Sequence, residues 1–347
     1  MSHVNTTRRG MMAFGAAALA APALAQSRQP LRISVWGGSW RDLVSEQIGR
    51  RFTQATGIPV EYQTGGTIDR LNRARLTRSA PESDITFTTS HIGWLYANDD
   101  LYERFDAAKV PNASRLVEQA RISPFHVGTW AYVYTIGWRP DLLPNMNFES
   151  WEDLWKPELR NRLAAPDFDP SHLIAVAAKL EGADAANWER GQDRLRALRP
   201  NFRAFYTNDA NSQQLIASGD TPVQVILSMN AHHIAGQGVN LRLAIPREGA
   251  VLGVDTAAVM KGSRNQEAAW RFIDMALDPA VQAGIAADKK GSPTVTGVQL
   301  PQNVASLPGV FTTPEQWSSQ ALIIDHRLRA EKTNEWRRWF QENIIAR

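Results

Sequence analysis

The chain has 347 residues, which is too long for one small core and favours two lobes. Its net charge of +3 arises from interspersed acidic and basic residues, not from a basic run, and this argues against nucleic acid as a partner. It has no cysteine, which excludes disulfides, thiolate catalysis, cysteine-based zinc sites and a lipid-anchored cysteine.

Residues 1–25 are predicted to be an export signal. Arg8 and Arg9 lie in a twin-arginine-like motif, and the apolar run that comes after them, to Leu24, is too short to span a bilayer as a permanent helix. Ala23-Leu24-Ala25 fits an A-x-A cleavage site, so the mature protein is expected to begin at Gln26. Both this route and the alternative, a general secretory signal, predict a soluble periplasmic protein without a lipid anchor.

The first part of the mature chain alternates strands and helices. Strands are predicted at 31–36, 58–62 and 84–87, and helices at 40–56 (capped by Gly57), 70–78 and 91–98. This order predicts βαβ units and a largely parallel sheet, in which ligands bind beyond the carboxyl ends of the strands. Those ends are Trp36-Gly37-Gly38-Ser39 and Thr88-Thr89-Ser90.

An aromatic-rich strand at 128–138 is predicted to cross to a second lobe. Ser150 then caps a short helix, with Asp153 at the third position completing a capping box. In the second lobe we expect strands at 163–165, 204–206, 222–227 and 241–245, and helices at 173–180, 185–198, 209–218 (capped by Gly219) and 230–236.

Residues 246–256 are predicted to cross back. The next strand contains one carboxylate, Asp255, and an amphipathic helix at 266–277 is expected to end at Asp278-Pro279, because a residue before proline is pushed out of the α region. Residues 285–310 are expected to be rich in loops, with a cleft-facing turn at 291–294. A terminal helix is predicted at 331–345.

The sequence contains no G-x-S-x-G, H-E-x-x-H, Walker or G-x-G-x-x-G motif. His232 and His233 are adjacent, so a helix cannot place them on one face, and they make a poor metal pair. We therefore expect a binding protein with no catalytic residue, no metal and no cofactor.

Several stretches together resemble one family. They are the opening VWGGSW, the segment SWEDLWKPELRNRLAAPD at 150–167, the turn Pro246-Arg247-Glu248-Gly249, the strand with Asp255, and the helix that ends at Asp278-Pro279. They resemble type II periplasmic solute-binding proteins of ABC importers, in the spermidine/putrescine-binding and related amine branch.

The resemblance implies an α/β fold of two lobes, each a mixed sheet flanked by helices, with a cleft and hinge between them. It implies lobe 1 over 26–135, lobe 2 over 136–252, a return into lobe 1 over 253–310, and C-terminal helices packing across the lobes over 311–347. Lobe closure around a ligand, membrane permease subunits and a cytoplasmic ATPase as partners, and a monomer are further expectations. An enzyme on the same scaffold and a periplasmic sensor without transport remain alternatives.

Trp36 and Asp255 match the family residues that contact a ligand's methylenes and its amine. An indole offers apolar area and attraction to an ammonium, and a carboxylate in an apolar strand is costly unless it is paired. The alternatives are that Trp36 belongs to the core between the lobes, and that Asp255 pairs with an Arg or Lys of the protein.

Other candidates lie where loops enter helices. Backbone N–H groups and hydroxyls there suit an anionic group, and simple N-capping is the alternative. The predicted ligand-binding residues are Trp36, Gly38, Ser39, Thr89, Ser90, His91, Asn230, Asp255 and Ser292, with Gly37, Asp167, Asp169 and Met229 as further candidates.

This chain also departs from the family pattern. The family's aromatic residue two before the aspartate is Gly253 here, its cleft tyrosine is Ser292, and its acidic pair aligns near Phe168 and Ser171. An aromatic cage with acids at both ends is thus incomplete, which weakens the case for a polyamine. The hypothesis is a ligand with one amine and an anionic end, such as a γ-aminobutyrate-like amino acid, an aminophosphonate or another small zwitterion.

Overall fold

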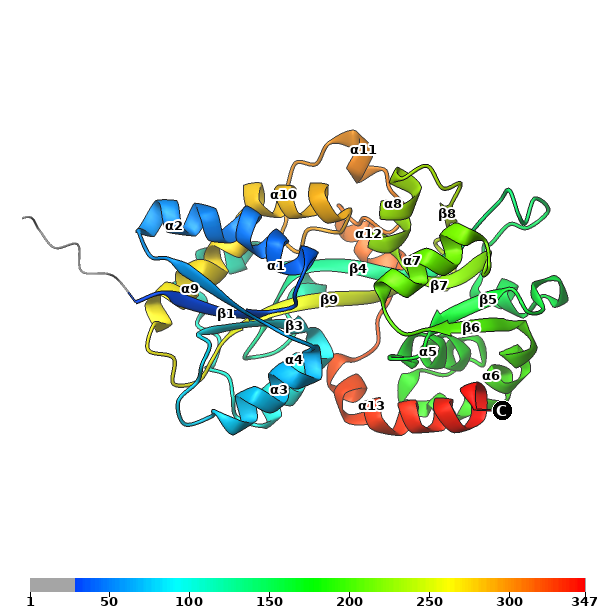
Figure 1. Ribbon diagram of the computed structural model, residues 1–347, viewed down its shortest axis with the longest axis horizontal. Helices are drawn as coiled ribbons and strands as arrows, with labels where there is room; N and C mark the ends of the chain where they lie inside the picture. Colours follow the sequence, from blue (N-terminus) through cyan, green and yellow to red (C-terminus); the bar gives the residue numbers. More distant parts are fainter. Residues whose placement is uncertain (1–28, 347) are drawn as a thin grey trace, which may run out of the picture.

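The computed structural model describes residues 29–346, so the predicted export signal at 1–25 lies outside the described residues. In this part of the chain no helix is both long and apolar enough to cross a membrane. Two α/β lobes lie side by side, connected by two long strands that run across the molecule (Figure 1). The predicted fold class is thereby confirmed.

The strands form one hydrogen-bonded sheet that passes through both lobes in the order β2-β1-β3-β9-β4-β7-β5-β6. In each lobe, strands that do not cross between the lobes pair with one another in parallel. In the first lobe β1 pairs with β2 and β3, and in the second lobe β5 pairs with β6 and β7. The strands are β1 Leu31–Val35, β2 Val60–Thr64, β3 Ile85–Thr89, β4 Val127–Trp138, β5 Leu163–Pro166, β6 Phe202–Tyr206, β7 Val223–Leu227, β8 Arg242–Leu243, β9 Ala250–Val259 and β10 Ala321–Leu322.

The crossing consists of β4 and β9, which pair antiparallel from Val127 with Ala257 to Tyr134 with Val251. The far end of β4 pairs with β7, and the far end of β9 pairs with β3. Both strands are buried along their whole length. The chain thus leaves one lobe on β4 and returns on β9, as the sequence predicts.

Helices cover both faces of each half of the sheet (Figure 1). On the left, α1, α2, α9 and α10 lie above the strands and α3 and α4 below; on the right, α7 and α8 lie above and α5, α6 and α13 below. The helices are α1 Ser39–Val44, α2 Arg50–Thr56, α3 Thr67–Leu76, α4 Ser90–Asn98, α5 Ser171–Leu180, α6 Gln192–Leu198, α7 Asp209–Ser218, α8 Ser228–Gly236, α9 Gln266–Ala276, α10 Pro279–Lys289, α11 Gln302–Ala305, α12 Pro314–Ser319 and α13 His326–Phe340.

The region predicted as loop-rich at 285–310 is partly helical, so that expectation was wrong at its start. Asp278 and Pro279 end α9 as expected, but they also begin α10. The Asp278 side chain accepts hydrogen bonds from Ala280 N and Val281 N, and proline suits the first position of a helix, where its missing N–H costs nothing.

The terminal helix begins five residues earlier than predicted, because Asp325 caps it by accepting a hydrogen bond from Leu328 N. This helix, α13, packs against both α4 and α5. It therefore connects elements of the two lobes and brings its own side chains to the space between them.

The SWED segment at 150–153 and the PREG turn at 246–249 contact each other. Ser150 Oγ donates to Glu248 Oε1 (2.6 Å), Trp151 N donates to Glu248 Oε2 (3.0 Å), and Trp151 Nε1 donates to Gly249 O (2.7 Å). The predicted capping box of Ser150 and Asp153 is also present. The SWED and PREG segments are thus two sides of one joint, which fixes the start of β9.

Candidate ligand-binding site

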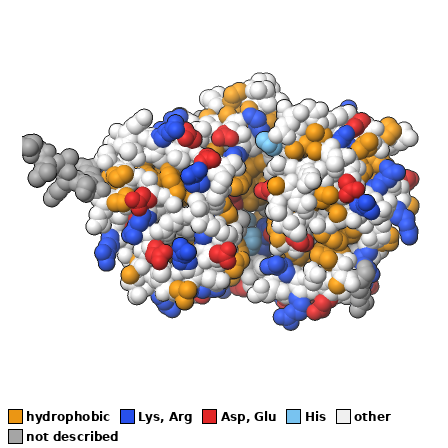
Figure 2. Space-filling view, in the orientation of Figure 1, with side chains coloured by type: hydrophobic (Ala, Val, Ile, Leu, Met, Phe, Trp, Pro, Cys, Tyr) orange, Lys and Arg blue, Asp and Glu red, His pale blue; other side chains and the backbone are white. Residues whose placement is uncertain are grey.

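A cavity of about 670 Å³ lies between the two lobes. Figure 2 shows the groove that separates the lobes, with hydrophobic side chains and a histidine visible inside it. The cavity is lined by the first turns of α3, α4 and α7, by β4 and β9, and by α13; its lining residues are Trp36, Trp40, Gly66, Thr67, Ile68, Asp69, Thr89, Ser90, His91, Ile92, Tyr132, Tyr134, Phe168, Asp169, Thr207, Asn208, Asp209, Leu227, Gly253, Val254, Asp255, Arg329, Thr333 and Arg337.

Asp255 is the most deeply placed acid of this cavity, with 3% of its surface exposed. Trp130 Nε1 donates to its Oδ2 (2.8 Å) and Tyr132 Oη donates to its Oδ1 (3.1 Å). Burial raises the pKa of Asp255 to about 7, although the hydrogen bonds from Trp130 and Tyr132 and the charge of Arg70 act in the opposite direction. Within the described residues no Lys, Arg or His forms an ion pair with it, so the alternative of an internal salt bridge is not what the structure contains.

Gly253 stands where the resemblance places an aromatic residue, and the neighbouring strand explains the change. A Cβ at Gly253 would lie 2.1 Å from Cε2 of Tyr132, so the tyrosine ring from β4 occupies that space. Tyr132 also lines the cavity and contacts Asp255. The aromatic wall is therefore present, but it comes from a different strand.

Trp36 lines the cavity and is fixed from behind by Arg70 of α3. The Arg70 guanidinium carbon lies 5.1 Å from the centre of the Trp36 ring, and Trp36 Nε1 donates to Thr67 Oγ1 (2.9 Å). Because Arg70 already makes the cation–π contact on that face, only the remaining ring surface is available, and it offers mainly apolar area.

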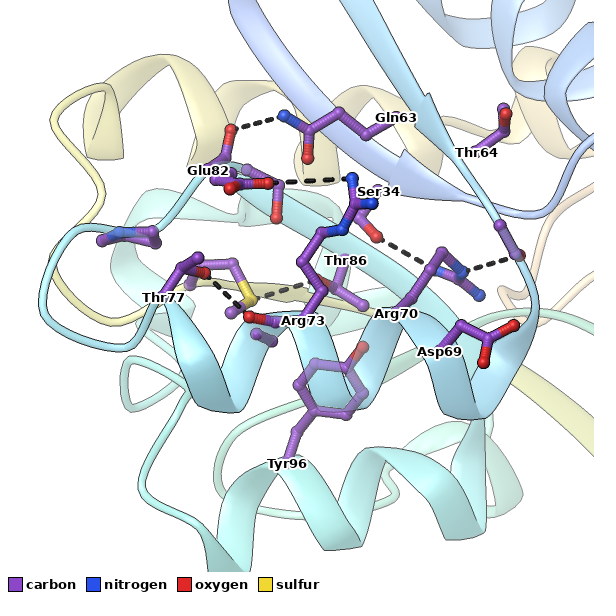
Figure 3. Close-up of a pocket in the computed structure, with 15 residues that line it drawn as sticks. Ser34, Gln63, Thr64, Asp69, Arg70, Arg73, Thr77, Glu82, Thr86 and Tyr96 are labelled. Atoms are coloured by element: carbon purple, nitrogen blue, oxygen red, sulfur yellow. Dashed lines mark hydrogen bonds and ion pairs between the residues drawn. The ribbon is translucent and has the colours of Figure 1, made fainter.

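Figure 3 shows how Arg70 is held, beside a small second cavity of about 80 Å³. Its Nε donates to Gly65 O (3.2 Å), and its Nη1 donates to Ser34 Oγ (3.2 Å) and Phe87 O (2.8 Å). These bonds tie α3 to β1 and β3, and so they fix the position of Trp36 at the end of β1.

The start of α4 contributes Thr89, Ser90 and His91, as the sequence predicts for a loop entering a helix. Thr89 is the N-cap, and no side chain caps this end of the helix. Ser90 Oγ lies 2.9 Å from His326 Nδ1, so it connects α4 to α13. His91 is buried, and its Nδ1 makes no hydrogen bond with any described residue.

Asp169 reaches the cavity but is already paired within the protein. Arg329 Nη2 of α13 donates to Asp169 Oδ2 (2.5 Å) and to His172 Nε2 (3.2 Å). Arg329 holds the pKa of the Asp169 carboxyl far below its usual range, against the effect of burial. Asp167, by contrast, does not line the cavity, so the structure does not bring the two predicted acids together.

Asp209, at the first position of α7, is a cavity acid that the sequence reasoning missed. Asn230 Nδ2 donates to its Oδ1 (2.9 Å), and burial raises its pKa. Asn230 was predicted to contact the ligand. In the structure it does not line this cavity, and its side-chain amide binds Asp209 instead.

Three of the predicted residues line a neighbouring cavity of about 650 Å³. Ser39, Met229 and Asn230 belong to it, and Trp40 and Asp209 line both cavities. The two spaces are therefore adjoining parts of the same groove.

Gly37, Gly38 and Ser292 line neither of these two cavities. Gly37 and Gly38 are exposed, and Gly38 adopts a φ of 59° just before α1. Ser292 is buried: its Oγ accepts from Phe311 N (2.8 Å), and its backbone pairs with Ala131. It holds a loop against β4.

Two elements, β4 and α13, supply further lining residues that sequence reasoning missed. Tyr132 and Tyr134 lie on β4, whose wealth of aromatics was the available signal. Arg329, Thr333 and Arg337 recur every four residues on α13, so their sequence spacing already places them on one helical face.

Comparison with known proteins agrees with this architecture. Residues 47–312 match the family of bacterial extracellular solute-binding proteins. The spermidine/putrescine-binding periplasmic protein of Salmonella typhimurium is 25% identical over 82% of this chain and 83% of its own length. The putrescine/cadaverine-binding protein of Pseudomonas aeruginosa is 27% identical over 84% of this chain and 85% of its own length.

Among solved structures, a spermidine/putrescine ABC transporter substrate-binding protein of Streptococcus pneumoniae has the same fold. It superposes with a TM-score of 0.78 at 20% identity, covering 92% of this chain and 99% of its own. These relatives are solute-binding proteins rather than enzymes. The chain belongs to the family of bacterial extracellular solute-binding proteins.

Proposed function

We propose that this chain is the periplasmic receptor of an ABC importer and that it captures a small amine-containing solute in the cavity between its lobes. The observation that carries the proposal is Asp255: a carboxylate in the wall of the cavity, held by neutral donors and without a cationic partner among the described residues. A protonated amine supplies the missing charge.

The rest of the cavity supports an amine with an apolar body. Asp209 is a second acid that no described cation pairs with, since its hydrogen bond comes from the Asn230 amide. Aromatic side chains that line the same cavity offer apolar area to methylene groups; they are Trp36, Trp40, Tyr132, Tyr134 and Phe168.

Delivery of the solute requires lobe closure, and the proposed hinge is the crossing of β4 and β9. The proposed lobe boundaries, at 135/136 and 252/253, fall within these two strands. Rotation about a few residues there would close the groove, and permease subunits in the membrane would recognise the closed form. The relatives named above, which include periplasmic polyamine-binding proteins, support this transport role.

A thermal-shift screen of residues 26–347 tests the proposal, after unfolding and refolding to remove any bound solute. The panel contains polyamines, ω-amino acids, aminophosphonates and simple organic acids. A ligand at about 100 times its dissociation constant stabilises by about 2.7 kcal/mol, which is a shift of several degrees.

Two variants assign the shift to the site. Asp255→Asn should abolish it, whereas Asp193→Asn, on an aspartate side chain that is 97% exposed, should leave it unchanged. If no amine shifts the melting temperature, or if Asp255→Asn retains the full shift, amine capture by this cavity is wrong.

A further inference from the structure

Three buried polar atoms around one end of the cavity make no hydrogen bond with any described residue. They are Thr89 Oγ1, His91 Nδ1 and Arg329 Nε. His91 and Arg329 are 8% and 5% exposed, and all three residues line the cavity. Buried polar groups in folded proteins are normally hydrogen-bonded, so this cluster has unused capacity for a polar group of a ligand.

The first turn of α4 adds backbone donors at the same place. Thr89 is its N-cap, and no side chain caps the helix, whose first residues, Ser90 to Ile92, line the cavity. The first N–H groups of a helix have no partner within it, and the helix dipole favours negative charge there. Donors of this kind select an anion.

Arg329 offers unused donors to this end of the cavity, although its charge is paired with Asp169. A guanidinium has five N–H donors, and the described bonds to Asp169 and His172 use only Nη2. The charge of Arg329 contributes to lowering the pKa values of His91 and His326, after the larger effect of burial. The imidazoles stay neutral near pH 7, and the arginine remains the cation.

This anion-selecting end lies close to Asp255. Thr89 on β3 is the residue paired with Asp255 on β9, so the two are separated by one strand spacing, about 4.8 Å. Tyr132 connects them further: it donates to Asp255, and its pKa, raised mainly by burial, also responds to the charges of Asp255 and Arg329. Acceptor and donors therefore line the same cavity.

We propose that the solute is a small zwitterion: its amine is bound by Asp255, and its carboxylate or phosphonate is bound by Arg329, His91 and the N-terminus of α4. This inference rests on the proposed amine-binding function and narrows it. A diamine would place its second ammonium beside the Arg329–Asp169 pair, where the unused donors offer it no acceptor, or would turn toward Asp209, which is the competing arrangement.

Isothermal titration calorimetry with compounds of matched length distinguishes zwitterion binding from diamine binding. The ligand-stripped protein is titrated with ω-amino acids of two to five carbons, 2-aminoethylphosphonate, diamines of the same lengths, and n-butylamine. The best zwitterion should bind at least about tenfold more tightly than the diamine of its length, because its anionic group gains a charged hydrogen bond that an ammonium cannot form with these donors.

Variants then assign the anionic end. Arg329→Lys keeps a charge beside Asp169 but removes Nε, and His91→Phe removes Nδ1 without altering the Arg329–Asp169 pair. Each should weaken zwitterion binding about ten- to a hundredfold and leave n-butylamine binding unchanged. Arg327→Lys, on an exposed neighbour in α13 that pairs with Glu331, is the matched control and should change neither.

The outcomes distinguish failure of this inference from failure of the proposed function. If a diamine binds as tightly as the matched zwitterion, the zwitterion inference is overturned and amine capture stands. If the zwitterion is preferred but neither Arg329→Lys nor His91→Phe weakens it, the assignment of its anionic end is wrong. If no amine of any kind binds, the proposed function fails, and this inference fails with it.

Discussion

Trp130 donates its indole N–H to Asp255 across the β4–β9 pair, over 2.8 Å. The Trp130 ring is itself stacked between Phe87 (5.6 Å between ring centres) and Trp40 (5.8 Å), at interplanar angles of 13° and 10°. The carboxylate is therefore presented to the cavity by a rigid aromatic stack. A fixed acid loses little freedom when it binds a cation, which favours affinity.

The first prediction concerns the pH dependence of the ligand-free protein. The pKa of Asp255 is about 7 in the folded state, against 3.8 for an unperturbed aspartate. Since the folded pKa is raised, the stability contribution is fully present below pH ~4 and is lost as the pH rises towards 7, by up to about 4 kcal/mol. Chemical denaturation at pH 4.5 to 7.5 should show that Asp255→Asn removes this dependence. A wild type and variant with parallel pH profiles would contradict it.

The second prediction concerns protons released on binding. An amine requires the ionised form of Asp255, and burial keeps part of this carboxyl protonated near its pKa of about 7. Amine binding at pH 6.0 should therefore release close to one proton, and affinity should increase up to pH ~8 and then level off. Titration in two buffers of different ionisation enthalpy measures the release. Binding with no proton release at pH 6.0 would mean that Asp255 is already ionised in the free protein.

The fold was predictable because its signals are local. Gly57 and Gly219 adopt positive φ (69° and 81°) where the helix-ending pattern placed them, and the Ser150 capping box needs only neighbouring residues. Asp278-Pro279 ends α9 as predicted, but α10 was missed because the same dipeptide also begins this next helix. A local stop signal carries no information on whether the next residues start another helix.

The site was predictable only in part, for two physical reasons. β4 is buried along all its residues, so it has no alternation of polar and apolar positions that would show Tyr132 facing a cavity. Arg329 reaches the cavity through the docking of α13 against α4 and α5, which is a long-range arrangement. Trp36 was placed correctly at the cavity because strand ends in such sheets meet there, whereas Asp255, which lies within β9, was placed there by the family resemblance.

The third prediction concerns the joint between the SWED and PREG segments. Hydrogen bonds from Ser150 and Trp151 lower the pKa of Glu248 against the effect of burial, so the folded state favours the ionised carboxylate. Glu248→Gln should destabilise the protein by about 1–3 kcal/mol, because it replaces charge-assisted bonds at a mostly buried side chain. Denaturant titration measures this, with Glu149→Gln as the exposed control. Equal stability of the two variants would show that the hydrogen bonds of Glu248 contribute nothing measurable to folding stability.

The last prediction concerns Gly253, whose missing side chain makes room for Tyr132. A methyl group there would meet the Tyr132 ring at 2.1 Å, so Gly253→Ala must displace the ring and with it the 3.1 Å hydrogen bond to Asp255. Overpacking of this kind costs about 1–3 kcal/mol of folding stability. Amine affinity should fall as well, because Asp255 loses one of its two donors and its fixed position.

Gly236→Ala is the matched control, because a Cβ at this position of α8 meets no atom within 4 Å. It should leave affinity unchanged and change stability by less than about 1 kcal/mol, in the stabilising direction. Melting curves and amine titration of both variants give the comparison. If Gly253→Ala kept wild-type stability and affinity, Tyr132 would have to move freely, and the rigid presentation of Asp255 would be wrong.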